Sequence, residues 1–183
     1  MSEFFFAKYY KFYRYEKTLS EEDGKYEIPE GFKIKELDPD KDYEKFRATW
    51  LKIYSKILPE PYVEFKKEDL LRYPTTYLLI NPEDEFIGFV VCYIKEEGKK
   101  GKILRIGVDE NYRKKGFGLL LYHKACEYFL NNNINEVYFD VYESDISLAR
   151  LAERAGFKKK EEFFITIDDP VENFINLKTI MSL

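Results

Sequence analysis

The chain has 183 residues, of which 45% are apolar and 35% are charged, and its formal net charge is −4. This length suits one domain, and the apolar content excludes a disordered chain. The negative charge argues against a surface that binds nucleic acid over its whole extent, because phosphate binders carry a strong basic excess.

The cysteines and the histidine bear on metal and redox chemistry. Cys92 and Cys126 lie in segments that read as a strand and a helix, and the only histidine, His123, lies on the polar side of a predicted helix. We expect two buried free thiols, a surface imidazole and no metal site. No apolar run approaches the ~18 residues of a membrane span, and the opening differs from a signal peptide, so we expect a cytoplasmic protein.

The N-terminal segment differs in composition from the rest of the chain. Residues 3–15 are rich in aromatic and basic side chains, and residues 20–24 are charged and turn-like. We therefore divide the chain into an N-terminal extension, residues 1–28, and a domain proper, residues 29–183. The extension either packs on the domain as an extra strand or helix, which is our preferred interpretation, or serves as a partner-binding arm, because single-strand binders interleave aromatic and basic side chains.

Hydrophobic periodicity predicts the elements of the domain. Apolar and charged residues alternate over residues 32–37, which predicts a strand, and Asp38 can cap an amphipathic helix predicted over residues 42–57. The later elements follow from the same periodicities and from Gly, Pro and Asn at the turns. In chain order they are a short helix over 64–73, strands over 77–80, 86–94 and 103–108, a helix over 118–131, a strand over 137–142, a helix over 146–155, a strand from 157, and a last strand over 174–183 or a short helix from 171.

This order predicts an α+β fold of three layers, with a mixed, mostly antiparallel sheet of about six to seven strands and helices on both faces. The front half is expected to be antiparallel, with a strand–helix–strand crossover behind it. Order alone does not give a function, so the functional interpretation depends on the connections between elements.

The connection over residues 109–118 joins a predicted strand to a predicted helix and carries three successive cations and two glycines. These residues are Arg113, Lys114, Lys115, Gly116 and Gly118. Glycines let a backbone approach an anion closely, and the first N–H groups of a helix lack internal partners and lie at the positive end of its dipole. The connection therefore suits a phosphate, although a solvated basic turn would use the same residues.

Two other phosphate-binding loops fit this segment less well. A Walker loop needs Ser or Thr after Gly-Lys, and neither follows Gly116 or Gly118. A dinucleotide fingerprint needs a third glycine where Leu121 stands.

With Arg113, Gly116 and Gly118 in the spacing Arg-x-x-Gly-x-Gly, the segment resembles the signature of the GCN5-related N-acetyltransferases, the GNAT family. The similarity extends over residues 102–160 and includes a following helix closed by Gly156-Phe157. The resemblance implies a GNAT-like fold and the transfer of an acetyl group from acetyl-CoA to a primary amine by direct attack on the thioester. Composition, and not the resemblance, argues against a metal, a membrane partner and a nucleic-acid partner.

The resemblance also implies where acetyl-CoA binds. In this family the fourth strand splays from the fifth, the pantetheine arm pairs with backbone in the gap, and the loop amides hold the pyrophosphate. We expect a strand bulge near Gly107 to open that gap, although an isolated glycine in a strand also fits simple weak packing. The implied cofactor-binding residues are Ile106, Val108, Arg113, Lys114, Lys115, Gly116, Phe117, Gly118 and Asp145.

The chain departs from its relatives at Ala152, which stands where many members carry a tyrosine that protonates the leaving thiolate. Another tyrosine, a water molecule, or a domain that binds without turnover would each account for this. We take Tyr142 as the candidate catalytic residue, with Tyr138 as a second candidate. The carboxylates available as a base, each of which also reads as a solvated or capping group, are Glu64, Asp140 and Glu143.

The acceptor is expected beside the early helices, and a protein amine, a polyamine and a small metabolite all remain open. Aromatic residues available on that side, which core packing explains equally well, are Tyr54, Tyr62, Phe65 and Tyr73. The alternative function is a non-catalytic acyl-CoA-binding or partner-binding domain of the same fold. A nucleic-acid module that uses the N-terminal segment ranks below both.

Overall fold

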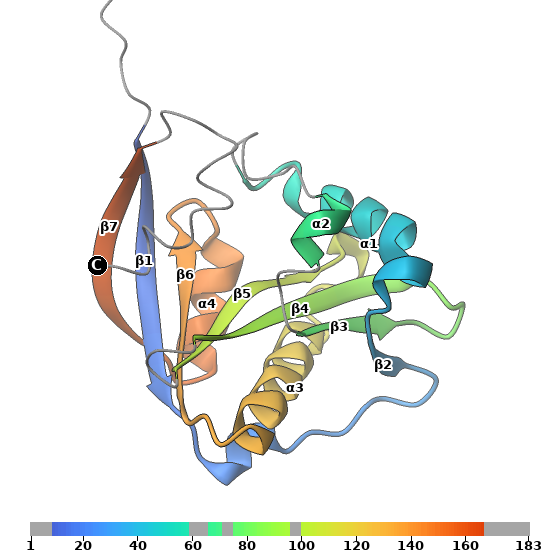
Figure 1. Ribbon diagram of the computed structural model, residues 1–183, viewed down its shortest axis with the longest axis horizontal. Coiled ribbons are helices and arrows are strands. Elements are labelled where there is room, and N and C mark those ends of the chain that lie inside the picture. The colour runs from blue at the N-terminus through green and yellow to red at the C-terminus, as the bar shows by residue number, and fades with distance from the viewer. Residues whose placement is uncertain (1–8, 59–65, 71–74, 96–99, 167–183) are drawn as a thin grey trace, which may run out of the picture.

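The computed structural model describes residues 9–58, 66–70, 75–95 and 100–166. Seven strands form one sheet in the order β2-β3-β4-β5-β6-β1-β7, and every neighbouring pair is antiparallel except β5 and β6 (Figure 1). The strands are β1 (Tyr9–Thr18), β2 (Lys33–Glu36), β3 (Thr75–Ile80), β4 (Phe86–Lys95), β5 (Lys100–Val108), β6 (Glu136–Tyr142) and β7 (Lys158–Thr166). The predicted mixed, mostly antiparallel sheet is confirmed.

Helices lie on both faces of this sheet, as predicted (Figure 1). The α-helices are α1 (Pro39–Tyr54), α2 (Lys67–Leu70), α3 (Phe117–Asn131) and α4 (Ile146–Arg154), and the short 3-10 helices are η1 (Glu21–Gly24) and η3 (Glu110–Tyr112). Among the described residues, no helix is both long enough and apolar enough to cross a membrane. The predicted strand over residues 174–183 lies outside the described residues. Half of the predicted helix over 64–73 is described, and it contains α2.

Helix α1 begins earlier than predicted because two residues before it favour a helix start. The Asp38 carboxylate accepts a hydrogen bond from the Asp40 N–H at 3.0 Å, and Pro39 occupies the first helical position. The apolar stripe of α1 then packs on the sheet, where Trp50 stacks on Phe89 of β4 at 5.3 Å between ring centroids. The helix thus covers β4 and β5 on one face.

Helix α3 packs on the opposite face of the same strands. Leu121, Cys126 and Phe129 are completely buried there, and Cys92 of β4 is buried in the same core. Gly101 of β5 lies beneath α3, where an added Cβ would come within 2.6 Å of the Phe129 ring. Both cysteines are free and buried, as the sequence predicted.

The N-terminal segment enters the sheet. Strand β1 lies between β6 and β7 and pairs with both, with Phe12 opposite Tyr142 on one side and Phe163 on the other. Helix η1 packs against α3, where the buried Asp23 carboxylate accepts a hydrogen bond from the Tyr122 hydroxyl at 3.0 Å. The described part of this segment is therefore integral to the sheet.

Candidate functional site

Strands β5 and β6 begin side by side and then separate. They pair only at Lys100–Glu136, Gly101–Val137 and Lys102–Tyr138, although β5 continues to pair with β4 as far as Val108 and β6 with β1 as far as Tyr142. Figure 1 shows the two strands running in different directions beyond this point. Over the described residues the sheet therefore opens into a V, and the inner edges of both strands face the gap.

A bulge in β5 accompanies this separation. Val91 of β4 lies opposite Arg105, and the next residue, Cys92, lies opposite Ile103, so that Leu104 is the extra residue. The prediction of a bulge near Gly107 was wrong. Gly107 pairs regularly with Phe89, and an added Cβ there would come within 2.9 Å of the Ile53 side chain. This glycine lets α1 approach the sheet closely, which a local reading of the sequence could not show.

A pocket occupies the narrow part of the V. Its walls come from β5, β6, β1, α1 and α4, and it is lined by Phe12, Tyr54, Leu58, Ile103, Leu104, Arg105, Ile106, Phe139, Asp140, Tyr142 and Leu148. The Tyr54 hydroxyl donates a hydrogen bond to the carbonyl oxygen of Ile106 at 3.0 Å. Burial raises the pKa of Tyr54, so this hydroxyl stays protonated at neutral pH.

Tyr142, the candidate catalytic residue, lines this pocket. It lies at the end of β6, with its ring centroid 5.4 Å from that of Phe12. Tyr138 lies outside the pocket lining, four residues earlier on β6, where Arg14 lies 4.8 Å and Lys102 5.3 Å from its ring. The structure therefore brings Tyr142, and not Tyr138, to the gap.

The loop over residues 113–118 lies at the open end of the V, directly after η3. Lys114 and Gly116 both have positive φ angles, of 61° and 89°, and Gly116 is the N-cap of α3. The first helical hydrogen bond runs from the Leu120 N–H to the Gly116 carbonyl oxygen, so the N–H groups of residues 117–119 lack an intrahelical acceptor. No atom lies within 4 Å of a Cβ added at Gly116, which leaves open space beside this backbone.

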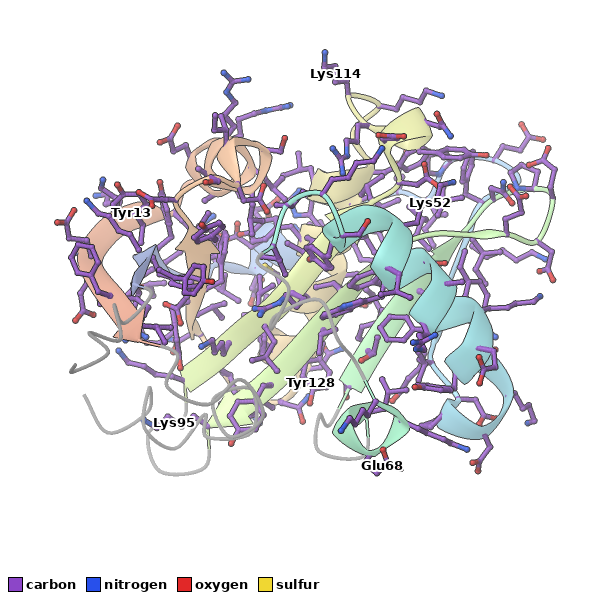
Figure 2. The ribbon with its side chains drawn as sticks, turned by 90° about the horizontal axis from the view of Figure 1, so that it is seen from above. Tyr13, Lys52, Glu68, Lys95, Lys114 and Tyr128 are labelled. Atoms are coloured by element: carbon purple, nitrogen blue, oxygen red, sulfur yellow. The ribbon has the colours of Figure 1, made fainter. Side chains whose placement is uncertain are left out.

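The side chains of the loop differ in how they are used. The Arg113 Nε donates to the Val108 carbonyl oxygen at 3.0 Å, and the Lys115 ammonium lies 5.2 Å from the Tyr112 ring centroid. Figure 2 shows Lys114 pointing outward at the tip of the loop. The Phe117 ring is buried, 4.7 Å from that of Phe32, so only its backbone is available to a ligand.

Asp145, a predicted cofactor-binding residue, precedes α4, and Ala152, where the chain departs from its relatives, lies within that helix. The buried Asp145 is the N-cap of α4, where its carboxylate accepts from the Leu148 N–H at 3.0 Å. Burial raises the pKa of Asp145, against the opposing effects of that hydrogen bond and of Arg113 and Arg105. Ala152 is completely buried in the core on the α3 side. Neither residue supplies a proton donor in the pocket, because the Asp145 carboxylate caps α4 and alanine has no polar group.

The three carboxylates considered as a base differ in their position relative to the pocket. Glu143 is exposed, and Glu64 lies outside the described residues, as do Tyr62, Phe65 and Tyr73. Asp140 lines the pocket, but its carboxylate lies 2.7 Å from the Lys102 ammonium and 2.8 Å from the Arg14 Nε. Burial alone would raise the pKa of Asp140, yet the two cations outweigh it and lower the pKa. Asp140 is therefore a weak base.

The other candidate groups lie away from the V. The His123 Nδ1 is 2.7 Å from the Asp23 carbonyl oxygen, which ties the imidazole to η1. Cys92 and Cys126 lie in the core under α3, where burial raises the pKa of both thiols. These three residues play no part in the pocket.

The sequence reasoning missed the contribution of β1. Phe12 lines the pocket and Arg14 holds Asp140, yet both belong to the segment that we interpreted as an extension. Their signal was the alternation over Tyr10, Phe12 and Arg14, which places these residues on one face of a strand. The pairing of that strand with β6 has no local signal, because Arg14 and Asp140 are 126 residues apart.

Comparison with known proteins gives a consistent picture. The model of the acetyltransferase (GNAT) family matches residues 43–157. N-alpha-acetyltransferase 30 from Xenopus laevis is 26% identical over 121 residues, which are 64% of this chain and 44% of that protein. The Homo sapiens protein of the same name is 26% identical over 118 residues, or 62% of this chain and 33% of that protein. This chain thus matches less than half the length of these relatives.

Solved structures share the fold at low sequence identity. A GNAT-family acetyltransferase from Novosphingobium aromaticivorans superimposes with a TM-score of 0.68 at 16% identity, covering 87% of this chain and 64% of that one. The PaiA N-acetyltransferase from Thermoplasma acidophilum, solved in complex with coenzyme A, superimposes with a TM-score of 0.60 at 21% identity. The match covers 69% of this chain and 89% of that one.

Proposed function

Because the chain belongs to the GNAT family of acetyltransferases, we propose that it moves an acetyl group from acetyl-CoA to a primary amine by direct attack of the amine on the thioester. The observation that carries this proposal is the V between β5 and β6, which leads from the glycine loop at its open end to a pocket at its narrow end. A nucleotide at the loop and a thioester at the pocket would occupy the two ends of one channel.

The loop is proposed to bind the pyrophosphate. Backbone N–H groups of residues 114–118 surround open space at Gly116, and the positive end of α3 favours an anion there. Arg113, Lys114 and Lys115 supply full positive charges beside it. Phe117 contributes its N–H alone, since its ring is buried, and Asp145 acts by holding the start of α4 beside the gap.

The pantetheine arm is proposed to lie along β5. From the pyrophosphate to the sulfur the arm has about twelve bonds, the length of about four residues of extended backbone. Counted back from Val108, this distance ends near Leu104, which is the bulge residue and a pocket residue. The carbonyls of Ile106 and Val108 already accept from Tyr54 and Arg113, but each carbonyl oxygen has a second lone pair for a ligand amide.

The chemical step forms a C–N bond and breaks the C–S bond, so the amine loses a proton and the departing thiolate gains one. We propose Tyr142 as the proton donor, because its ring lines the pocket and Ala152 has no proton to give. Tyr54 is proposed to position the reacting groups, since its hydroxyl already bonds the Ile106 carbonyl. With Asp140 neutralised by two cations, the proton of the amine passes to solvent. The orientation of the two reactants lowers the barrier separately, by about 7–11 kcal/mol.

The acceptor is proposed to be the α-amino group of a peptide. The support is the similarity to N-alpha-acetyltransferase 30 of two vertebrates, at 26% identity. The alternative function, a domain that binds acyl-CoA without turnover, is favoured by one observation only, the alanine at position 152. Turnover of acetyl-CoA distinguishes the acetyltransferase from the non-catalytic domain.

The experiment that tests this function measures free thiol released from acetyl-CoA in the presence of matched acceptors. The acceptors are a peptide with a free α-amine, the same peptide with a blocked α-amine and one lysine, and a polyamine. Release that depends on the free α-amine supports the proposal, and release only with the lysine peptide or the polyamine would correct the acceptor. No release with any amine, from protein that binds acetyl-CoA, would favour the non-catalytic alternative.

A further inference from the structure

Four charged side chains form a row across four neighbouring strands. Lys102 of β5 lies 2.7 Å from Asp140 of β6, Asp140 lies 2.8 Å from Arg14 of β1, and Arg14 lies 3.5 Å from Glu161 of β7. Arg14 is directly opposite Asp140 in one register and Glu161 in the other. The charges alternate in sign along the row, which we call the charge ladder.

The inner part of the charge ladder is almost completely removed from solvent. The side chains of Lys102 and Asp140 are 6% and 9% exposed, whereas Glu161 at the outer end is 52% exposed. Removing two charges from water costs several kcal/mol per ion before their attraction is counted, and a buried pair is often no more stable than apolar side chains of the same size. Stability alone therefore does not explain why Lys102 and Asp140 occupy this position in the sheet.

That position is the vertex of the V. Lys102 and Tyr138 form the last paired position of β5 and β6, and Asp140 is the next residue along β6 on the same face. The Lys102 ammonium reaches across the first unpaired step to the Asp140 carboxylate, which lines the pocket. Asp140 thus closes the narrow end of the pocket, and Lys102 and Arg14 hold its carboxylate from outside the lining.

The proposed path of the pantetheine arm places the acyl group at this closed end. The sulfur is expected near Leu104, so the acyl carbons beyond it point toward Ile103, Phe139 and Asp140. Each carboxylate oxygen of Asp140 accepts a charge-assisted hydrogen bond, from the Arg14 Nε at 2.8 Å on one side and from Lys102 at 2.7 Å on the other. The Asp140 carboxylate at the closed end is therefore held in one position and is charged.

We propose that Asp140, held by hydrogen bonds from Lys102 and Arg14, forms the floor of the acyl pocket and restricts the donor to acetyl-CoA. A propionyl or butyryl group would have to displace a hydrogen-bonded ion pair or place methylene groups against it. Neither is favourable, because a pinned pair leaves no space and an apolar chain cannot replace the hydrogen bonds that it would break. The inference rests on the proposed function and adds a determinant of donor specificity to it.

The first test compares acetyl-CoA, propionyl-CoA and butyryl-CoA as donors for the wild-type protein, with one acceptor. We expect kcat/KM to fall by about tenfold or more for the first added methylene, within the range of about 10- to 200-fold that one methylene can produce. Equal use of acetyl-CoA and propionyl-CoA would overturn the inference while leaving the proposed function intact. Absence of turnover with every donor would contradict the proposed function itself.

The second test neutralises the floor with the double variant Lys102→Met, Asp140→Asn. Uncharged side chains of similar size are tolerated at buried ion pairs, and methionine adapts its shape to a longer chain. We expect the ratio of kcat/KM for propionyl-CoA to that for acetyl-CoA to rise about tenfold or more. The matched control is Glu161→Gln, at the exposed outer end of the charge ladder, which should leave the ratio unchanged.

A third variant keeps the inference testable if the double variant does not fold. Asp140→Glu retains the charge and adds one methylene group at the floor. It should weaken acetyl-CoA binding relative to CoA, which lacks the acyl group, as measured by calorimetry. Equal loss for both ligands, or an unchanged donor ratio in a folded double variant, would overturn the assignment.

Discussion

The hydroxyl of Tyr54 in α1 bonds the carbonyl oxygen of Ile106 in β5 across 3.0 Å, inside the V between β5 and β6. A side chain of α1 therefore contacts the edge of β5 that faces the gap. The close approach depends on Gly107, next to Ile106, where a Cβ would come within 3.4 Å of the same hydroxyl. One helix thus fixes the backbone along which the pantetheine arm is proposed to lie.

Replacing Tyr54 with Phe should separate packing from this hydrogen bond. The ring remains, so the core is kept, but the Ile106 carbonyl loses a partner. We expect the free energy of unfolding to fall by about 0.5–1.5 kcal/mol in urea denaturation, and KM for acetyl-CoA to rise. An unchanged KM would show that the Tyr54 hydroxyl does not position the Ile106 carbonyl for acetyl-CoA.

Tyr142→Phe tests the proposed proton donor. If Tyr142 protonates the thiolate, kcat should fall by about 10²-fold or more while calorimetric affinity for acetyl-CoA stays the same. The matched control is Tyr13→Phe, because Tyr13 lies on β1 but packs against the core on the α3 side. Equal activity of both variants would exclude Tyr142 and leave solvent as the proton source.

Gly107→Ala tests the close contact between α1 and β5. The added methyl group would lie 2.9 Å from Ile53, so the helix or the strand must shift, at an expected cost of about 1–3 kcal/mol in the free energy of unfolding. Gly118→Ala is the control, since a Cβ there meets Leu151 at an ordinary 3.5 Å. If the two variants are equally stable in urea, the contact with α1 is not what requires glycine at position 107.

The charge ladder predicts a pH dependence of stability. The pKa of Asp140 is lower in the folded protein than in the unfolded chain, where a carboxyl group titrates near pH ~3.9. Its contribution to stability is therefore complete at neutral pH and is lost as the pH falls below about 4, through the folded pKa. Between pH 7 and pH 3 the free energy of unfolding should fall more steeply for the wild type than for Asp140→Asn. If the free energy of unfolding falls equally with pH in both proteins, Asp140 does not stabilise the fold through its ion pairs.

The sequence predicted what is local and missed what depends on distant pairing. The loop at Arg113 to Gly118 could be predicted because its glycines, its cations and the helix start lie within six residues. The bulge at Leu104 and the ion pair of Lys102 with Asp140 could not, since they depend on the register between strands. The place of β1 between β6 and β7 was out of reach for the same reason.

The central claim, that the loop and the V hold acetyl-CoA, is tested most directly by calorimetric titration of the wild type, Gly116→Ala and Gly116→Asp with acetyl-CoA. Gly116 has a φ angle of 89°, so both variants carry backbone strain, which is no greater for aspartate than for alanine, but only aspartate adds a negative charge where the pyrophosphate is proposed to lie. The account predicts micromolar binding by the wild type, a modest loss for Gly116→Ala, and a further loss of about tenfold or more for Gly116→Asp. Equal affinities of the two variants, or no binding by the folded wild type, would contradict it.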